Sequence, residues 1–231
     1  MSDVILDFND VTRVYRQGNL EVAALRGLNL TIRKGEFAAL VGPSGSGKST
    51  ALNLAGALDI PTTGTVSLEG QDLSGMSKQQ LSHLRRDRIG FVFQAYNLIP
   101  VLTAYENAEA VLDLQGVPPA ERRDRVMALL GEMGLEGMEN RRPDELSGGQ
   151  QQRVAIARAI AANPAIVLAD EPTANVDSET AELLLGIMER LNKERGVTFL
   201  FSTHDPRVMA HARRIIRLVD GRVDTDDIKS S

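Results

Sequence analysis

The sequence predicts an α/β fold whose central sheet is mostly parallel. Three short, mostly apolar runs have the pattern of strands buried on both faces, namely Phe37–Val41, Ala165–Ala169 and Thr198–Phe201. A segment with helical character follows the first two runs, and this order of strand, loop and helix is typical of parallel α/β sheets. A chain of 231 residues is long enough for one large α/β domain or one domain with an inserted lobe.

The composition limits the classes of protein. The 26 Lys and Arg residues against 31 Asp and Glu give a net charge of -5, so no overall basic field favours nucleic acid as a partner. Cysteine is absent, which excludes disulfides and thiolate metal sites and fits a reducing compartment. The first residues lack a basic segment followed by an apolar core, and no run approaches the roughly 18 apolar residues of a membrane span. We therefore expect a soluble protein in which any role at a membrane goes through a partner.

The chain begins with two segments in which polar and apolar residues alternate. Val4–Tyr15 and Ala23–Ile32 have this period of two, which is typical of half-buried antiparallel strands, and Gly18-Asn19 is the expected turn between them. After the first predicted helix, Pro61–Gly64 breaks the chain and Thr65–Gly70 is a further short strand.

A helical insert is predicted in the middle of the chain. Arg88–Gln94 is another core strand, and between Tyr96 and Leu146 the character of the sequence changes to helical. Glu121–Leu130 is an amphipathic helix, and the two prolines before it suit a helix N-terminus. The insert separates the first core strands from the later ones.

The last third of the chain returns to the core. Asp177 and Ser178 are expected N-caps for a helix that runs to about Arg195 and is stopped by Gly196. Residues 215–223 are expected to form a hairpin over an Asp-Gly turn, and the polar tail after Asp224 is expected to fray. No internal repeat is visible, so one functional unit per chain is expected.

The first predicted parallel strand leads into a glycine-rich loop with the phosphate-binding pattern G-x-x-x-x-G-K-[ST]. The loop and the start of its helix consist of Gly42, Pro43, Ser44, Gly45, Ser46, Gly47, Lys48, Ser49 and Thr50. Glycines let backbone N–H groups approach phosphate oxygens closely, Lys48 would face the β- and γ-phosphates, and the Ser49 hydroxyl would bind Mg²⁺. The alternative is a Gly/Ser turn beside a surface lysine, but the flanking strand and helix favour a nucleoside triphosphate site.

Two carboxylates follow the second buried strand. Asp170 and Glu171 lie where ligands of parallel α/β sheets gather. In a phosphate-loop enzyme the first carboxylate would hold Mg²⁺ and the second would polarise a water in line with the γ-phosphate. The alternative interpretation is a strand end followed by a solvated acidic turn.

A second candidate phosphate binder precedes a long helix. Ser147, Gly148, Gly149 and Gln150 stand directly before that helix, whose N-terminus would offer free N–H donors. In isolation, Ser147 could equally be an N-cap with a flexible Gly-Gly entry.

Taken together, the sequences GPSGSGKST, LSGGQ, IVLADEPT and STHD resemble those of ATP-binding-cassette (ABC) ATPases over nearly the whole chain. The resemblance implies a P-loop NTPase core with a RecA-like, mostly parallel sheet, an antiparallel β subdomain and an α-helical subdomain at about 96–157. Residues 1–231 would form a single nucleotide-binding domain. It further implies a head-to-tail homodimer, in which each ATP lies between the phosphate loop of one chain and Ser147–Gln150 of the other.

The resemblance also implies roles for individual residues. Tyr15 would stack on adenine, Gln94 would sense Mg²⁺ and the attacking water, and Asp170 would bind the metal. Glu171 would be the catalytic base, Asp177 would communicate across the dimer and His204 would contact the γ-phosphate. Each of three residues also has a simpler interpretation. Tyr15 could be a packed strand residue, Gln94 an ordinary amide at a strand end, and His204 a histidine in a capped turn. The sequence departs from close relatives at Ala174, where they usually have glycine.

Further segments are similar to the lipoprotein-release and macrolide-export branch of these ATPases, for example Asn97–Pro100 and Leu102–Asn107. This branch implies a subunit on the cytoplasmic face of the inner membrane that hydrolyses ATP with Mg²⁺ and drives a separate permease. The apolar segment after Gln94 is expected to belong partly to the core and partly to a groove for a permease helix, with Leu98 in the groove.

Two other classes compete with this interpretation. One is a soluble ABC ATPase of DNA repair or translation, but the insert lacks sustained heptads and the chain has no basic tract. The other is a regulatory cassette without turnover, which the presence of both Glu171 and His204 disfavours.

Overall fold

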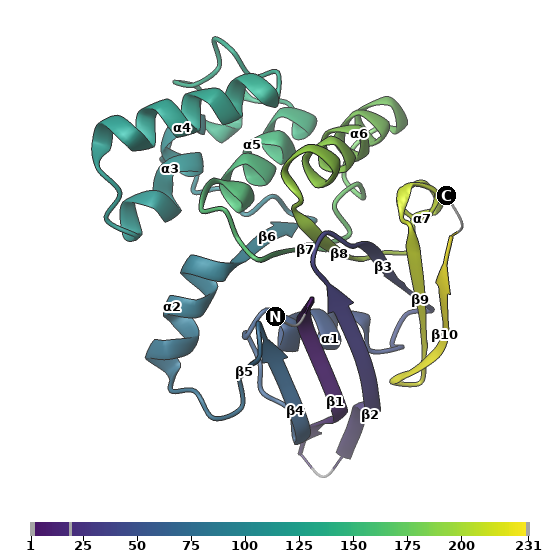
Figure 1. The fold of residues 1–231 in the computed structure, drawn as a ribbon. Helices are drawn as coiled ribbons and strands as arrows, with labels where there is room; N and C mark the ends of the chain where they lie inside the picture. The colour runs from purple at the N-terminus through teal and green to yellow at the C-terminus, as the bar shows by residue number, and fades with distance from the viewer. Residues whose placement is uncertain (1–2, 19, 230–231) are drawn as a thin grey trace.

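The computed structural model describes residues 3–18 and 20–229, and within them it contains a four-stranded and a six-stranded sheet with helices around them (Figure 1). The predicted α/β fold class is confirmed, with a mostly parallel core sheet, a separate antiparallel sheet and a group of helices. In this part of the chain, none of the helices combines the length and apolar character that crossing a membrane requires.

The antiparallel sheet has the order β2-β1-β4-β5. Its strands are β1 (Val4–Gln17), β2 (Leu20–Arg33), β4 (Thr63–Leu68) and β5 (Gln71–Asp72). The two long alternating segments therefore pair as predicted, and they extend beyond their expected ends. Of the expected turn, Gly18 has φ +61°, whereas Asn19 lies outside the described residues.

The core sheet has the order β10-β9-β3-β8-β7-β6, in which only β10 runs antiparallel to its neighbour. Its strands are β3 (Phe37–Val41), β6 (Ile89–Phe93), β7 (Ile166–Asp170), β8 (Thr198–Ser202), β9 (Arg214–Val219) and β10 (Arg222–Ile228). The carboxyl ends of β3, β6, β7 and β8 thus lie along one edge, where the predicted site residues follow them.

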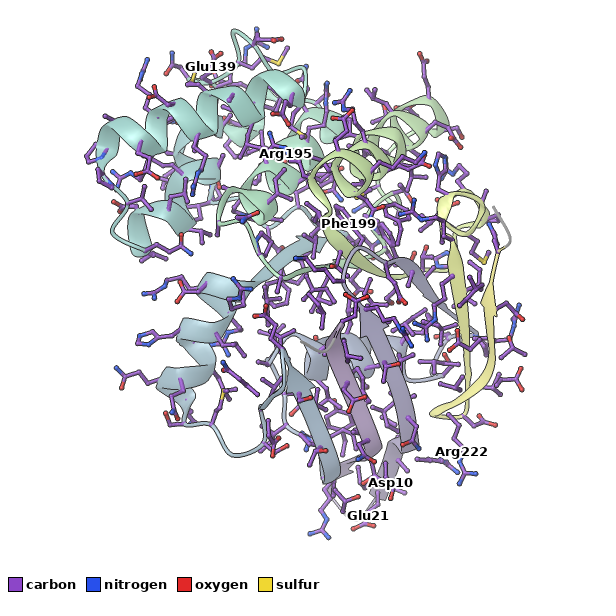
Figure 2. All side chains as sticks on the ribbon, in the orientation of Figure 1. Asp10, Glu21, Glu139, Arg195, Phe199 and Arg222 are labelled. Atoms are coloured by element: carbon purple, nitrogen blue, oxygen red, sulfur yellow. The ribbon has the colours of Figure 1, made fainter. Side chains whose placement is uncertain are left out.

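The parallel strands β3, β6, β7, β8 and β9 contribute side chains to two separate hydrophobic cores, because successive residues point to opposite faces of a sheet. Phe37, Phe199 and Phe201 lie on one face with helices α5 (Gly148–Ala161) and α6 (Ser178–Arg195). The rings of Phe37 and Phe201 are 4.7 Å apart. Figure 2 shows Phe199 deep in the molecule, while labelled charged residues such as Glu139 and Glu21 lie at its ends.

The opposite face of the core sheet packs on helix α1 (Lys48–Ala55) and on the antiparallel sheet. Leu40 and Leu200 point to this side and are fully buried. The phosphate-loop helix is thereby fixed between the two sheets.

The helical insert contains α3 (Ala104–Leu114), α4 (Pro119–Glu132) and the short η1 (Pro143–Glu145), which lead to α5. Helix α4 agrees with the predicted amphipathic segment and has proline at its first position. Figure 1 shows α3, α4 and α5 grouped at one end of the molecule, next to α6. The limits of the helical subdomain and of the single domain stay predictions.

Helix α6 agrees closely with the sequence signals at both of its ends. The side chain of Asp177 accepts a hydrogen bond from the Thr180 N–H at 2.9 Å, and the helix ends at Gly196 with φ +66°. Such caps are local features of sequence, which explains the agreement.

Helix α2 (Lys78–Arg88) was not predicted. Leu81 is its one buried residue among those described, so the helix lacks the apolar stripe that marks most surface helices. Ser77 and Gln80 form a capping box at its start, and this Ser-x-x-Gln pattern is a local sequence signal of a helix N-terminus.

The expectation that the tail frays after Asp224 is wrong. Strand β10 continues to Ile228, which pairs with Arg214 of β9. Arg214 forms ion pairs with Asp226 at 2.7 Å and with Glu36 at 2.8 Å. Polar residues hold this edge strand in place through charge pairing, which an apolar pattern cannot reveal.

Candidate functional site

The predicted phosphate loop joins β3 to α1, and its backbone needs glycine at two positions. Gly42 and Gly47 have φ +150° and +102°, in the region that side-chain residues avoid. A Cβ atom on Gly42 would lie 2.2 Å from the Leu218 carbonyl oxygen, and one on Gly47 would lie 2.6 Å from that of Ala24. The loop therefore sits against β9 and β2 at distances that only glycine permits.

Lys48 and Ser46 are among the residues of this loop whose polar groups suit a ligand. The Lys48 ammonium donates hydrogen bonds to the carbonyls of Gly42 at 2.8 Å and Pro43 at 3.0 Å, so it is held over the loop. The hydroxyl of Ser46 is buried, and in the described part of the chain it has no hydrogen-bond partner. A buried polar atom without a partner is costly unless a ligand satisfies it.

A cavity of about 760 Å³ opens above the loop. It is lined by all of residues 42–50 together with Val22, Ala23, Ala24, Gln94, Asp170, Glu171, Ser202 and His204. The structure thus brings together the phosphate loop, the residue after β6, the acidic pair after β7 and the histidine after β8. A volume of this size is in the range of small-molecule and cofactor pockets.

Asp170 and Glu171 face this cavity from the end of β7. Burial raises the pKa of the Asp170 carboxyl, the neighbouring Glu171 carboxylate acts in the same direction, and a hydrogen bond with Ser202 and the charge of Lys48 oppose both. Glu171 has a left-handed backbone with φ +45°, and its N–H donates to the Ser202 carbonyl at 2.9 Å. The two carboxylates are therefore held between β7 and β8 in an arrangement that a cation would stabilise.

The side chain of Glu171 is bound on both of its oxygens. His204 Nδ1 lies 2.6 Å from Oε1, and the Thr203 hydroxyl donates to Oε2 at 3.0 Å. The His204 side chain is 78% exposed, so it borders the cavity rather than filling the core.

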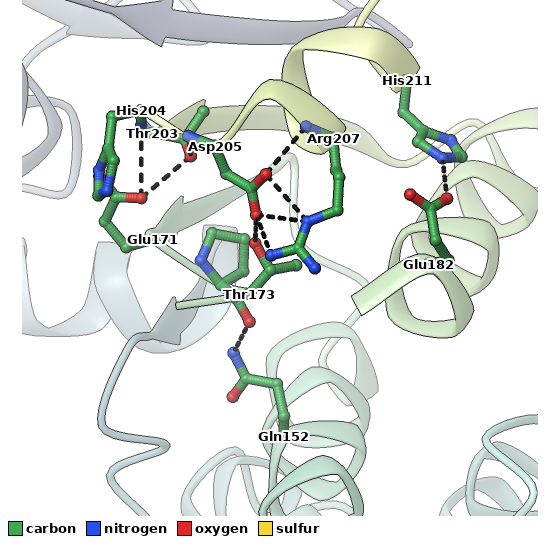
Figure 3. A network of polar contacts seen from close by, with 10 residues as sticks. Gln152, Glu171, Thr173, Glu182, Thr203, His204, Asp205, Arg207 and His211 are labelled. Atoms are coloured by element: carbon green, nitrogen blue, oxygen red, sulfur yellow. Dashed lines mark hydrogen bonds and ion pairs between the residues drawn. The ribbon is translucent and has the colours of Figure 1, made fainter. Parts of the chain in front are cut away.

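Asp205 fixes the chain directly after His204. Although burial opposes it, hydrogen bonds from Arg207 and Thr173 hold the pKa of the Asp205 carboxyl at about 2. The Thr173 hydroxyl donates to Asp205 at 2.7 Å, which joins the segment after β7 to the start of α7 (Pro206–His211). Figure 3 shows this network between Glu171 and Arg207.

Tyr15 lies beside the cavity but is not among the described residues that line it. Its partner in the β1-β2 pairing is Val22, which does line the cavity. Its hydroxyl donates to Asp59 at 2.8 Å, and the Arg13 guanidinium carbon lies 4.6 Å from the ring centroid. One face of the ring is thus covered by Arg13, and adenine stacking stays a prediction.

Ser147–Gln150 and Asp177 also lie outside this cavity. The Ser147 hydroxyl accepts from the Gln150 N–H at 3.3 Å, and the Gln150 side chain accepts from the Ser147 N–H at 2.8 Å, so Ser147 is the N-cap of α5. A Cβ atom on Gly149 would lie 2.4 Å from the Thr180 methyl group. The glycine pair therefore has a packing role, and binding of a nucleotide on a partner chain stays a prediction.

Oxygen ligands for a cation meet in the cavity. The Ser49 hydroxyl, the Gln94 amide and the Asp170 carboxylate all line it, and this set suits a hard cation such as Mg²⁺. Among residues 3–18 and 20–229, no group of three His, Asp or Glu side chains is gathered for a metal. A cation here would thus take further ligands from phosphate and water, as Mg²⁺ commonly does.

Sequence reasoning missed the cavity residues Val22–Ala24 and Ser202. Ser202 ends a predicted parallel strand, so its place at the ligand edge could have been inferred. Residues 22–24 reach the cavity only because Gly47 and Gly221 pack against Ala24, which no local pattern indicates.

The fold and this site define an ATP-binding cassette, which is an ATP-hydrolysing class of P-loop protein. The chain belongs to the ABC transporter family, since residues 25–174 match the family described as ABC transporter. This confirms the resemblance found in the sequence.

Curated relatives agree with this assignment. The chain is 46% identical over 224 residues to a macrolide export ATP-binding/permease protein MacB of Syntrophobacter fumaroxidans, covering 96% of this chain and 31% of that protein. It is also 46% identical over 227 residues to an uncharacterized ABC transporter ATP-binding protein, MJ0796, of Methanocaldococcus jannaschii, covering 96% and 97% of the two chains. The chain therefore spans about a third of the length of the MacB relatives.

Solved structures give the same result. The dimeric structure of a post-hydrolysis state of the cassette MJ0796, bound to ADP and Pi, matches with a TM-score of 0.90 and 44% identity. The match covers 98% of this chain and 100% of that chain.

Proposed function

We propose that this chain binds ATP with Mg²⁺, hydrolyses it in a head-to-tail homodimer and drives a separate membrane permease of the export or lipoprotein-release type. The proposal rests on the finding that the predicted site residues lie in two separate places on one chain. The cavity contains the phosphate loop, Asp170 and Glu171, whereas Ser147–Gln150 lie outside it. A second copy of the chain would supply its own Ser147–Gln150 over the open side, and the dimeric structures of the MJ0796 cassette support the pairing of two copies.

The phosphate loop would bind and orient the triphosphate. The N–H groups of residues 44, 45 and 47–50 and the Lys48 ammonium would donate to phosphate oxygens, and the buried Ser46 hydroxyl would gain a partner. Ser49, Gln94 and Asp170 would hold Mg²⁺, which supplies charge neutralisation on the β- and γ-phosphates. The Tyr15 ring would stack on the adenine at the β2 side of the cavity.

Glu171 would act as the general base. One carboxylate oxygen would accept a proton from a water that attacks the γ-phosphorus, and the bond between that phosphorus and the bridging oxygen would break. Thr203 would keep Glu171 in place through its 3.0 Å hydrogen bond. His204, which contacts the same carboxylate, would turn to donate to the γ-phosphate, and its exposure leaves it free to do so.

The activity has a direct test in one variant with a matched control. Lys48→Ala should abolish Mg²⁺-dependent ATP hydrolysis, because it removes the charge that faces the phosphates. Lys193→Ala removes an exposed lysine on α6 that pairs with Glu189, and it should retain wild-type turnover. Wild-type protein without Mg²⁺-dependent phosphate release would contradict the proposal.

The permease would dock in a second hollow of about 380 Å³ at the edge of the core sheet. Its lining combines the stacked rings of Phe91 and Phe93, 5.5 Å apart, with Leu58, which is 51% exposed. Arg85 and Arg86 stand at the same hollow. This chemistry suits a short permease helix with one apolar face and acidic residues beside it.

The expected place of Leu98 in this groove is corrected by the structure. Leu98 is half-buried and packs against the hydrophobic core, and it is not among the described residues that line the hollow. The exposed apolar residues of this segment are Ile99 and Val101. A charge at Leu98 would therefore test folding rather than docking.

Leu58→Glu is the better test of docking, with Leu183→Glu as its control, since both side chains are 51% exposed. In a pull-down with the permease of the neighbouring reading frame, Leu58→Glu should lose binding while the isolated subunit still hydrolyses ATP. Leu183→Glu, on α6, should keep both. Equal binding by the two variants would contradict the proposed groove. A bound permease would place the subunit on the cytoplasmic face of the inner membrane.

A further inference from the structure

The chain adopts an unfavourable backbone directly after Gln94. Tyr96 and Asn97 have φ +60° and +51°, and two consecutive left-handed residues with side chains are rare. Such a turn persists only where surrounding contacts hold it. Because Gln94 lies two residues before this turn, the contacts that hold the turn also determine how Gln94 enters the nucleotide cavity.

Arg158 of α5 supplies those contacts. Its Nη1 donates to the Asn97 carbonyl at 2.5 Å and its Nη2 donates to the Tyr96 carbonyl at 2.9 Å. Arg158 is half-buried at the second hollow, where partial burial lowers the pKa of its guanidinium, and the two carbonyls of the turn are its hydrogen-bond acceptors. The planar guanidinium presents its two N–H donors in a fixed fork that holds both carbonyls of the turn at once.

Two further contacts tie the turn to the segment after Glu171. The Tyr96 hydroxyl donates to the Asn175 carbonyl at 3.1 Å, and the Asn175 side chain donates back to the Gln94 carbonyl at 2.9 Å. Gln152, also on α5 and fully buried, donates to the Pro172 carbonyl at 2.6 Å. Helix α5 therefore holds both segments that carry candidate catalytic side chains.

We propose that Arg158 is a positioning residue for Gln94, which passes movement of α5 to the Mg²⁺ side of the nucleotide cavity. Helix α5 begins at Ser147, where the partner chain's nucleotide is proposed to bind. Closure of the dimer would therefore act on Gln94 of the same chain through Arg158. This inference rests on the proposed function and adds a link between the two sites of the dimer.

The test is a double-mutant cycle with Arg158→Met and Gln94→Ala. Arg158→Met should lower kcat about tenfold, and the double variant should be no slower than Gln94→Ala alone, because the arginine acts through the glutamine. Arg153→Met is the matched control. Arg153 lies on the same helix and donates to the carbonyls of Met133 and Gly134, away from the cavity, so its loss should leave kcat unchanged.

A second readout does not depend on turnover. In the Glu171→Gln background, Mg²⁺ is titrated against the ATP-induced rise in melting temperature. Both Arg158→Met and Gln94→Ala should move the Mg²⁺ midpoint upward, and Arg153→Met should not. If Arg158→Met fails to fold, Arg158→Lys replaces it, since an ammonium cannot hold both carbonyls in the fork geometry of a guanidinium.

Additive losses in the cycle, an unchanged kcat or an unchanged Mg²⁺ midpoint would overturn the inference. Wild-type protein is measured in the same series. If the wild type hydrolyses no ATP, the proposed function fails, whereas normal turnover in both wild type and a folded Arg158 variant refutes only the role of Arg158.

Discussion

His204 Nδ1 lies 2.6 Å from Oε1 of Glu171, so the segment after β8 and the segment after β7 are joined by a direct polar contact. Both segments are held by further hydrogen bonds: the Glu171 N–H donates to the Ser202 carbonyl, and the Asp205 carboxylate accepts from the Thr173 hydroxyl. A shift of one segment would therefore move the other, and under the proposed function both side chains would respond together to the γ-phosphate.

We predict that His204→Ala lowers kcat by about a hundredfold or more, because it removes a proton-bearing group beside the base. The melting temperature should change little, since the side chain is 78% exposed. Steady-state kinetics and thermal melting measure both effects. His83→Ala removes an exposed histidine of α2 and should keep wild-type kcat; full activity of the His204 variant would argue against the role.

The N-cap at Ser147 allows its structural and functional roles to be separated. Aspartate caps helices as well as serine does, so Ser147→Asp should keep the melting temperature within about 2 °C of wild type. Its added carboxylate would repel the partner's γ-phosphate and prevent the ATP-bound dimer.

Ser77→Asp is the matched control for this prediction. Ser77 caps α2 with the same capping box, formed with Gln80, and lies outside the nucleotide cavity. Light scattering of both variants in the Glu171→Gln background compares them. ATP-dependent dimers of Ser147→Asp would show that Ser147 serves the helix alone.

Asp205 gives a prediction about pH. Its folded-state pKa of about 2 is below the ordinary 3.8, so the carboxylate stabilises the fold above the unfolded pKa and this stability is lost as pH falls through the folded pKa. Asp205→Asn should lower the free energy of unfolding by about 2 kcal/mol at pH 7. Urea titrations should find the same difference down to about pH 5 and a shrinking one between about pH 4 and 2.

The control for this measurement is Asp224→Asn, which changes an exposed aspartate on β10. Its effect should stay within about 0.5 kcal/mol at every pH. A difference for Asp205→Asn that grows toward acid pH would have the wrong sign for a depressed pKa.

Much of the fold was predictable because its signals are local. The phosphate loop, the buried strands at 37–41 and 166–170, and the caps of α6 all follow from neighbouring residues. Their partners in space also follow, since the carboxyl ends of parallel strands share one edge of a sheet. The meeting of Asp170, Glu171 and His204 in one cavity is thus a consequence of pattern and topology.

The remainder depends on contacts between distant segments. Helix α2 has one buried apolar residue among those described, and β10 is held by the ion pairs of Arg214, so neither shows an apolar pattern. The sequence pattern does not separate the groove expected for Leu98 from the core against which it packs, because an apolar loop segment can contact either a partner protein or the core. The role of Arg158 was invisible, since its acceptors are backbone carbonyls 61 and 62 residues away.

The central claim is that two chains share each ATP, and Glu171→Gln tests it most directly. The glutamine keeps the shape of the side chain and loses the base, so ATP should remain bound and closed dimers should accumulate. Size-exclusion chromatography at micromolar concentration, with and without ATP and Mg²⁺, measures this. We predict that ATP shifts the variant to the elution volume of a dimer, whereas a monomer that persists with bound ATP would contradict the account.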